Sequence, residues 1–280
     1  LPTPSMNHQI PSPERQPVLF IGHGSPMNAI EDNAFRRAWS ALGEDLLAKA
    51  DSRPRAILCI SAHWVTRGWW LTGMASPRTI HDFGGFPQAL FDVQYPAPGD
   101  PELARELAEA LTQPSDGQPL GLDGRHWGLD HGAWSVLQPM FPKADIPVIQ
   151  LSIDMGCPMS EHLALGRQLA GLRSMGILIV ASGNTVHNLR AMHRDATPDQ
   201  AYDWAMAFDA EVADCITRHD VNGLADLPGS SAVGRLAHPS WEHYAPLLYA
   251  AGAAGESAYA SFFNEAFQGA SIAMRSVVWR

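Results

Sequence analysis

The stretch Ile177-Leu178-Ile179-Val180-Ala181-Ser182-Gly183 is an apolar run that ends in small residues, and His187 follows four residues later. Short apolar runs bounded by glycine and serine are typical of buried parallel strands. The same pattern occurs twice more and ends in His23 and His63. In open α/β sheets, ligands bind outside the carboxyl ends of the strands. We therefore expect three imidazoles at one edge of a sheet, which predicts a metal site and hence an enzyme.

The apolar pattern divides the chain into strands and helices. Strands are expected at residues 18–22, 55–62, 69–74, 147–153 and 177–181, followed by a closing hairpin or antiparallel edge at 259–263 and 271–279. Helices are expected at residues 33–49, 101–111, 132–140, 161–175, 199–219 and 246–252. Residues 75–100 are rich in proline and glycine, which predicts a long ordered loop of the kind that carries function.

Length and charge exclude several classes of protein. The 280 residues suit one large α/β domain, expected at 17–280, after a flexible leader at 1–16. The net charge is -10 and no run of lysine and arginine occurs, so neither nucleic acid nor a membrane surface is an expected partner. No apolar run reaches the roughly 20 residues that span a bilayer. Three scattered cysteines indicate a reducing cytoplasm.

The strand-end histidines each have a structural alternative. His23 lies between Gly22 and Gly24, which let the backbone turn and leave the imidazole exposed at the strand end. A hydrogen-bonded histidine at the end of a sheet is the other interpretation of His23 and of His63. Trp64, directly after His63, is interpreted either as the wall of a pocket for a flat substrate or as a core side chain.

His187 is expected to be a metal ligand or a general acid/base. Residues 182–185 predict the start of a helix that carries His187 in its first turn. A helix N-terminus lowers the pKa of an imidazole and favours the neutral form that both roles need.

His243 lies in Pro239-Ser240-Trp241-Glu242-His243-Tyr244, directly before a predicted helix. Neighbouring side chains of an extended segment point opposite ways, so one of Glu242 and His243 is expected to face the site, with helix capping as the alternative. His81 and His131 lie in loops among glycines and aromatic residues, where a catalytic role and a structural hydrogen bond are both open. Histidine nitrogens with at most one carboxylate suit zinc or non-haem Fe(II), and ligand type does not separate these metals.

Short motifs in a fixed order carry a resemblance to a known family. They are Gly22-His23-Gly24-Ser25-Pro26-Met27, Ser61-Ala62-His63-Trp64, His81-Asp82-Phe83-Gly84-Gly85-Phe86-Pro87, Gly128-Leu129-Asp130-His131-Gly132, Gln150-Leu151-Ser152, Ser182-Gly183-x-x-x-His187-Asn188 and Pro239-x-x-Glu242-His243-Tyr244. This set resembles the DOPA 4,5-dioxygenase branch of the class III (LigB-type) extradiol ring-cleavage dioxygenases. The resemblance runs from about Val18 to the end of the chain.

The resemblance implies a single α/β domain with a mixed, mostly parallel central sheet flanked by helices. It implies metal ligands at His23, His63 and His243, with His187 as a fourth ligand or as the catalytic acid/base. Members of the superfamily that act on protocatechuate complete the site with a glutamate, so the choice between Glu242 and His243 stays open.

The implied reaction is extradiol cleavage of a catechol, DOPA-like or related, with O2 to a muconic semialdehyde. Fe(II) is the expected working metal, and zinc has also been seen in this kind of site. His187 would take a hydroxyl proton and His131 would help to stabilise anionic intermediates. The expected substrate pocket consists of Trp64, His81, Phe83, Phe86 and Trp134. A homo-oligomer is left open.

Two other functions compete with this prediction. A zinc hydrolase would use the same histidines to activate water, and a non-enzymatic binding protein would share the fold with an incomplete metal set. Serine hydrolysis, P-loop phosphate binding and dinucleotide binding receive no support, because the sequence lacks G-x-S-x-G, G-x-x-x-x-G-K-[ST] and G-x-G-x-x-G.

Overall fold

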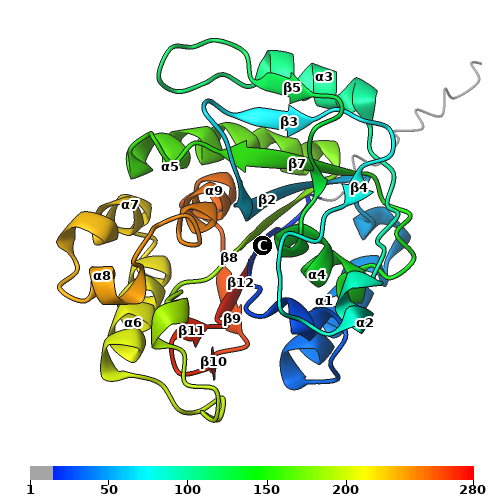
Figure 1. Ribbon diagram of the computed structural model, residues 1–280. Helices are drawn as coiled ribbons and strands as arrows, with labels where there is room; N and C mark the ends of the chain where they lie inside the picture. Colours follow the sequence, from blue (N-terminus) through cyan, green and yellow to red (C-terminus); the bar gives the residue numbers. More distant parts are fainter. Residues whose placement is uncertain (1–14) are drawn as a thin grey trace, which may run out of the picture.

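The computed structural model describes residues 15–280, and residues 1–14, most of the predicted leader, lie outside the described residues. One eight-stranded sheet runs through the molecule in the order β5-β3-β7-β2-β8-β1-β12-β9 (Figure 1). Its strands are β1 (Val18–Gly22), β2 (Ala56–Val65), β3 (Trp70–Thr72), β5 (Gly121–Asp123), β7 (Val148–Ile153), β8 (Ile177–Gly183), β9 (Ala260–Phe263) and β12 (Ser276–Trp279).

The pairing of the strands confirms a mixed, mostly parallel sheet. The central strands β7, β2, β8 and β1 are parallel neighbours. At one side β12 and β9 add as antiparallel strands, which is the predicted closing edge. At the other side β3 is antiparallel to β7 and parallel to β5. Two small ribbons lie outside this sheet, formed by β4 (Arg78–Thr79) with β6 (Gly128–Leu129) and by β10 (Phe267–Gln268) with β11 (Ile272–Ala273).

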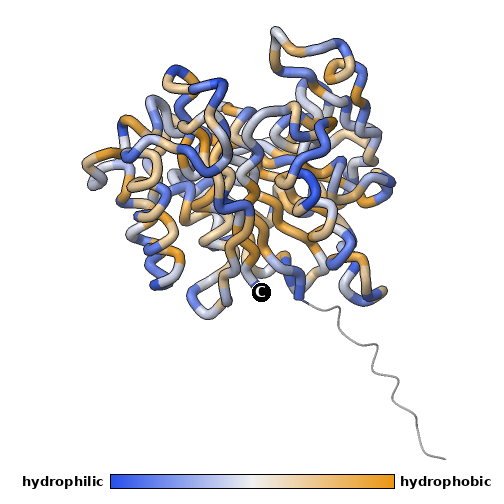
Figure 2. Tube along the Cα trace, turned by 90° about the horizontal axis from the view of Figure 1, so that it is seen from below, coloured by the Kyte–Doolittle hydropathy of each residue, from blue (hydrophilic) through white to orange (hydrophobic). Residues whose placement is uncertain are grey.

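The central strands are mainly apolar and almost wholly buried because they are covered on both faces. Along β1, Val18 and Phe20 belong to one core cluster, whereas Leu19 and Ile21 belong to the other. Helices α5 (Met159–Gln168) and α9 (Ala245–Ala254) cover the first face, and α1 (Ala34–Leu47) and α4 (His131–Met140) cover the second (Figure 1). Figure 2 shows hydrophobic residues gathered along the interior strands and hydrophilic residues in the outer loops.

Side-chain caps fix where several helices begin. Asn33 accepts a hydrogen bond from the backbone amide of Arg36 at the start of α1, and Asp130 accepts one from the backbone amide of Ala133 at the start of α4. Asp100 caps α3 (Pro101–Ala110). The remaining helices are α2 (Gln88–Phe91), α6 (Asp203–Thr217), α7 (Val221–Ser230) and α8 (Gly234–Ala237), with 3-10 turns η1 (Pro26–Ala29), η2 (Ala50–Ser52), η3 (Leu169–Met175) and η4 (Leu189–Ala191). Within residues 15–280, none of the helices combines the length and apolar character needed to cross a bilayer.

One local prediction is wrong. Residues 182–185 do not begin a helix, because β8 continues to Gly183 and the backbone amides that follow bond to distant segments. Asn184 N donates to His243 O at 2.9 Å, and His187 N donates to Ala237 O at 2.9 Å. A regular turn begins only at η4. His187 is therefore held by tertiary contacts and not by a helix N-terminus.

Candidate active site

Three histidines from separate parts of the chain converge at the carboxyl edge of the sheet. His23 directly follows β1, His63 lies near the end of β2, and His243 precedes α9. Nε2 of His23 lies 3.2 Å from Nε2 of His63. The ring of His243 lies 5.3 Å from that of His23 and 4.9 Å from that of His63. One nitrogen of each ring lies within 4.8 Å of the others, so the three imidazoles could hold a metal ion.

Gly183 allows His243 to reach this edge. A Cβ atom on Gly183 would lie 2.2 Å from the carbonyl oxygen of His243, closer than real Cβ contacts allow. The next amide, of Asn184, donates to that same oxygen. The end of β8 therefore anchors the segment that carries His243.

The chemistry of the three rings suits a metal ion. Burial lowers the pKa of each of the three well below the usual value for histidine, and the neighbouring imidazoles add to the effect, so the rings are neutral and could act as ligands. Nδ1 of His23 bonds to Ser182 Oγ at 2.9 Å, which leaves Nε2 for a metal. Among the described residues, neither ring nitrogen of the buried His243 has a hydrogen-bond partner.

The spacing of the nitrogens agrees with this chemistry. Metal–nitrogen bonds of about 2.0–2.1 Å in a tetrahedral site place two ligand nitrogens roughly 3.3 Å apart. The Nε2 atoms of His23 and His63 are separated by 3.2 Å. An unpaired buried imidazole such as His243 beside them is costly unless a metal ion or another partner satisfies it.

Asp82 joins His63 to His131 and was not among the predicted site residues. Its Oδ1 lies 2.9 Å from Nδ1 of His131 and also accepts from the backbone amide of His131. Its Oδ2 lies 3.6 Å from Nδ1 of His63. Burial acts to raise the pKa of Asp82, but the hydrogen bonds from His131 and the charges of His131 and His63 outweigh it and hold the pKa below its usual value. The residue therefore stays ionised and orients both rings.

His187 stacks face to face on His243. The ring centroids are 3.5 Å apart and the planes differ by 3°. His187 lines the same cavity but does not belong to the group of nitrogens that includes His23, His63 and His243. Burial lowers its pKa to about 4, against an opposing effect of Glu242. The neutral form that was expected is present, although burial and not a helix N-terminus produces it.

His131 rests on a buried polar network at the start of α4. Asp130 accepts hydrogen bonds from Ser61 Oγ at 2.6 Å and from Gln150 Nε2, and it caps the helix through the amide of Ala133. Burial raises the pKa of Asp130. This network holds the first turn of α4 against β2, which fixes the position of His131.

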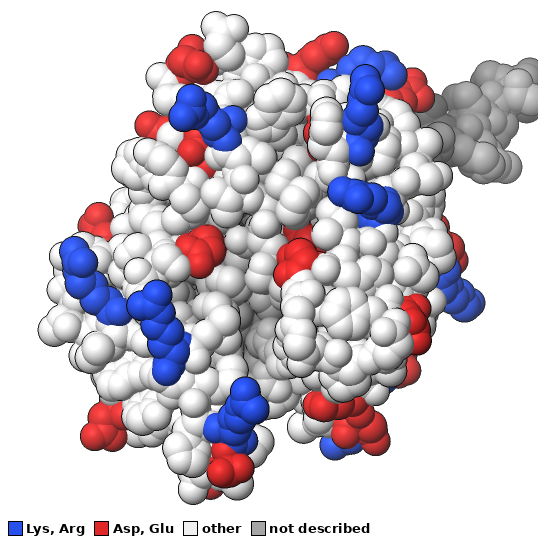
Figure 3. Space-filling model, viewed as in Figure 1, with Lys and Arg blue, Asp and Glu red and all other residues white. Residues whose placement is uncertain are grey.

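The histidines line one wall of a cavity of about 260 Å³. Figure 3 shows the hollow near the centre of this face, surrounded mostly by uncharged atoms. A dry cavity of about 150 Å³ takes benzene, so this one has room for a single substituted ring. It is lined by His23, Gly24, Ser25, Pro26, His63, Asp82, Phe83, Phe86, His131, His187, Leu189, Met192, His243 and Ile272.

Comparison with known proteins decides the family. Residues 17–276 match the family model described as the catalytic LigB subunit of aromatic ring-opening dioxygenase. The chain belongs to this LigB family. It is 49% identical over 259 residues to the "4,5-DOPA dioxygenase extradiol" of Escherichia coli (strain K12), covering 90% of each chain. The protein of the same name from Beta vulgaris is 38% identical, covering 90% of this chain and 92% of the relative.

A solved structure agrees with the LigB fold seen here. The crystal structure of uncharacterized protein JW3007 from Escherichia coli K12 superposes with a TM-score of 0.76 at 40% identity, covering 94% of this chain and 99% of that one. The chain is thus an aromatic ring-opening extradiol dioxygenase of the LigB type, as its motifs predicted. The zinc-hydrolase and binding-protein alternatives are not favoured by these relatives.

The LigB-family cavity includes only part of the predicted aromatic wall. Phe83 and Phe86 line it. Trp64 lies outside it and stacks on Trp127 with the ring planes 6° apart, because adjacent strand residues face opposite sides of the sheet. Trp134 is fully buried in α4 and donates to Ile80 O, so it supports the wall from behind.

His81 also lies behind the lining of the LigB-family cavity. Its Nε2 bonds to Val93 O at 2.8 Å, and its ring packs edge-on against Phe83. Leu189, Met192 and Ile272 line the cavity instead and were not predicted. No local pattern marks them, because they come from segments that only tertiary contacts bring to the site.

Proposed function

We propose that this LigB-family enzyme cleaves the ring of a DOPA-like or related catechol with O2, in the extradiol position, to give a muconic semialdehyde. The observation that carries the proposal is the meeting of three neutral imidazoles, from the buried His23 and His243 and the half-buried His63, in one cavity that admits a single ring. The names of the relatives at 49% and 38% identity supply the substrate class.

His23, His63 and His243 would hold the metal, with Fe(II) as the working ion and Zn(II) as an ion that a preparation could also contain. Bound there, Fe(II) would supply Lewis acidity toward the catechol and reactivity with O2. His243 is preferred to Glu242 because it lines the cavity with both ring nitrogens unpaired. The Glu242 carboxylate is partly exposed and accepts from Ser240 Oγ at 2.7 Å.

His187 serves as the acid/base rather than as a fourth ligand. A ring with a pKa of about 4 is neutral at pH 7, so one of its nitrogens can accept a proton from a catechol hydroxyl. The ring of His187 stacks face to face on the ring of His243 and so lies beside the proposed ligands. Its nitrogens do not belong to the group formed by the nitrogens of His23, His63 and His243. The proton it gains can be returned later in the reaction.

His131 and the two phenylalanines position the substrate. Asp82 engages Nδ1 of His131, which leaves Nε2 as the nitrogen available to a substrate oxygen. Phe83 packs edge-on against Phe86 and the ring of His131, so these side chains form one wall for a flat ring. A ring held between this wall and the histidines has its hydroxyl groups facing His187 and the proposed ligands.

Three free cysteines, Cys59, Cys157 and Cys215, fit a reducing compartment, and we propose a cytoplasmic location. A homo-oligomer remains part of the proposal, to be tested by light scattering.

The test is a catechol panel on protein reconstituted with Fe(II) under anaerobic conditions. On admission of air, we expect stoichiometric O2 uptake and a yellow ring-opened product. Protein loaded with Zn(II) should show neither. Absence of O2 uptake with every catechol, together with ester or amide hydrolysis by the zinc form, would replace the proposal with the hydrolase.

A further inference from the structure

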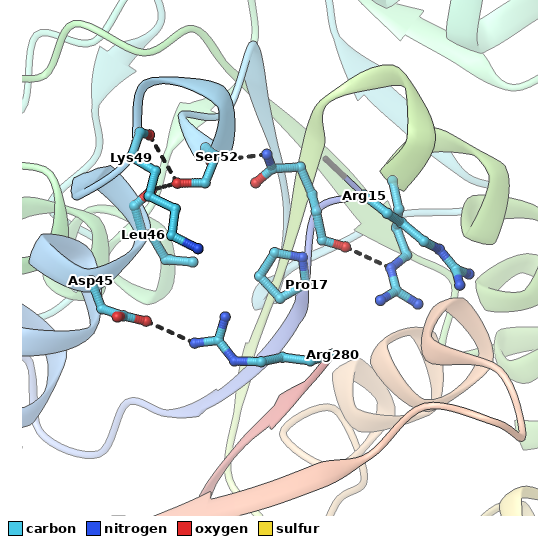
Figure 4. Close-up of a pocket in the computed structure, with 9 residues that line it drawn as sticks. Arg15, Pro17, Asp45, Leu46, Lys49, Ser52 and Arg280 are labelled. Atoms are coloured by element: carbon cyan, nitrogen blue, oxygen red, sulfur yellow. Dashed lines mark hydrogen bonds and ion pairs between the residues drawn. The ribbon is translucent and has the colours of Figure 1, made fainter. Parts of the chain in front are cut away.

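A second cavity, of about 330 Å³, lies at the opposite end of β1 from the candidate active site. Pro17 precedes β1 and Arg280 follows β12, and these antiparallel strands pair from Val18 with Trp279. The five residues of β1 separate this cavity from His23 by about 16 Å. We call it the basic cavity, and it is lined by Arg15, Gln16, Pro17, Asp45, Leu46, Lys49, Ser52, Arg173 and Arg280 (Figure 4).

The charge of the basic cavity is opposite to that of the whole chain. The sequence has 29 acidic residues and 19 basic ones. Four of the basic residues line this cavity, against Asp45 alone on the acidic side among the described residues. Figure 4 shows Lys49 and Arg280 on one side of Pro17 and Arg15 on the other. Because these residues are far apart in sequence, the cluster exists only in the folded chain.

Arg173 is the part of the cavity that is hardest to explain without a ligand. It is 1% exposed, and within residues 15–280 its hydrogen-bond partners are main-chain carbonyls and not carboxylates. Nε donates to Gln16 O at 2.7 Å, and Nη1 donates to Ala254 O at 3.0 Å. Burial and the nearby charge of Arg15 lower the pKa of Arg173 to about 10. A buried cation beside a second cation is destabilised, and an anion bound between them would relieve the repulsion.

A structural role explains some of these contacts but not the cluster. By donating to Ala254 O, Arg173 satisfies the carbonyl end of α9, where a cation is favourable. That role needs neither Lys49 nor Arg280. Arg280 pairs with Asp45 at 2.8 Å, but both side chains are more than half exposed, and such pairs contribute little to stability. The Arg280 guanidinium can therefore contact a ligand at little cost.

We propose that the basic cavity binds a small organic anion with two or more negative charges, carried by phosphate or carboxylate groups. Arg15, Lys49 and Arg280 supply the cations at its mouth, and Arg173 supplies a fixed charge at its inner side. Pro17 and Leu46 give an apolar surface for the carbon part of the ligand. The site is separate from the catechol cavity and does not take part in ring cleavage.

Isothermal titration calorimetry tests this proposal. The metal-loaded enzyme is titrated with inorganic phosphate and with succinate, at a constant ionic strength set by sodium chloride. We expect saturable binding of at least one of the two anions at a single site. The double variant Lys49→Gln/Arg280→Gln should raise the Kd at least tenfold. The matched control is Arg218→Gln, because Arg218 pairs with Asp214 at the end of α6 and does not line the cavity. It should leave the Kd unchanged.

The two anions separate the sources of the charge, since binding of phosphate alone indicates a phosphorylated ligand and binding of succinate alone indicates a carboxylated one. O2 uptake with catechol should be the same in the double variant and in the control, which shows that the variant is folded. The proposal is overturned if neither anion binds, or if the double variant binds with the Kd of the control.

Discussion

At the scale of single residues, His63 and Trp64 show how the geometry of a strand decides which side chain reaches the cavity. They are neighbours on β2, and the pleat sends them to opposite faces of the sheet. His63 reaches the cavity, while Trp64 stacks on Trp127 away from it. The position of His63 near the end of a buried strand was sufficient to predict that it lies at the carboxyl edge of the sheet. Motif adjacency was not sufficient to place Trp64 in the same pocket.

Replacing His187 should separate catalysis from metal binding. His187→Ala removes the proposed proton acceptor, and we expect kcat to fall by about 10²–10⁴-fold. Iron content, measured by elemental analysis, should stay close to that of the parent protein, since the other three histidines remain. His243→Ala serves as the comparison and should lose most of the metal. Near-full activity of His187→Ala would exclude the acid/base role.

A substitution of Asp82 tests whether this carboxylate orients the rings of His63 and His131. Asp82→Asn keeps the shape of the side chain but weakens its hold on His131 and His63. We expect a loss of roughly 10–100-fold in kcat/KM, because groups that orient ligands typically have effects of this size. Asp92→Asn, on the exposed end of α2, is the matched control. Equal activity of the two variants would show that Asp82 has no orienting role.

At the scale of elements, the long central strands were predictable, whereas the short edge strand β5 and the segment after β8 were not. Runs such as Ile177–Gly183 are buried on both faces, so their composition alone marks them. The path of residues 184–187 depends on amides that donate to His243 and Ala237, which no local pattern reveals. Helix α7 (Val221–Ser230) was missed for a related reason: it contains Gly223 and Pro228, yet packing keeps it helical.

The junction of β8 with the His243 segment should be sensitive to a single methyl group. In Gly183→Ala the new Cβ would collide with the backbone of His243. We expect about 1–3 kcal/mol of destabilisation in urea unfolding, together with weaker metal binding. Gly171→Ala is the control, because a Cβ there meets nothing within 4 Å. If both variants retain the parent stability and metal content, Gly183 does not position His243.

At the scale of the whole molecule, the two ends of the central strands carry different chemistry. The carboxyl ends of β1, β2 and β8 lead to neutral imidazoles, and the opposite end of β1 meets the basic cavity. Composition predicted the class of the fold, because 280 residues with doubly buried strands suit one α/β domain. It could not predict either cavity, since each is assembled from segments distant in sequence.

The fold should lose stability as the pH falls from about 6.5 to 4, partly because of His162. This residue of α5 is fully buried, bonded through Nδ1 to Tyr249 Oη of α9 at 2.7 Å and packed against Trp69. Burial lowers its pKa to about 4, so below pH 6.5 the unfolded chain binds a proton that the folded chain does not. One pKa unit corresponds to about 1.4 kcal/mol, so this group can remove roughly 3 kcal/mol by pH 4.

His162→Gln isolates this contribution, because glutamine is polar but does not titrate. The variant is expected to be less stable than the parent at pH 7, through the lost contacts with Tyr249 and Trp69, and to have a shallower decline in unfolding free energy between pH 6.5 and 4. His193→Gln, at an exposed position, is the control and should keep the parent slope. An unchanged slope in His162→Gln would mean that the remaining buried histidines, led by His238 with its pKa of about 3, account for the acid sensitivity.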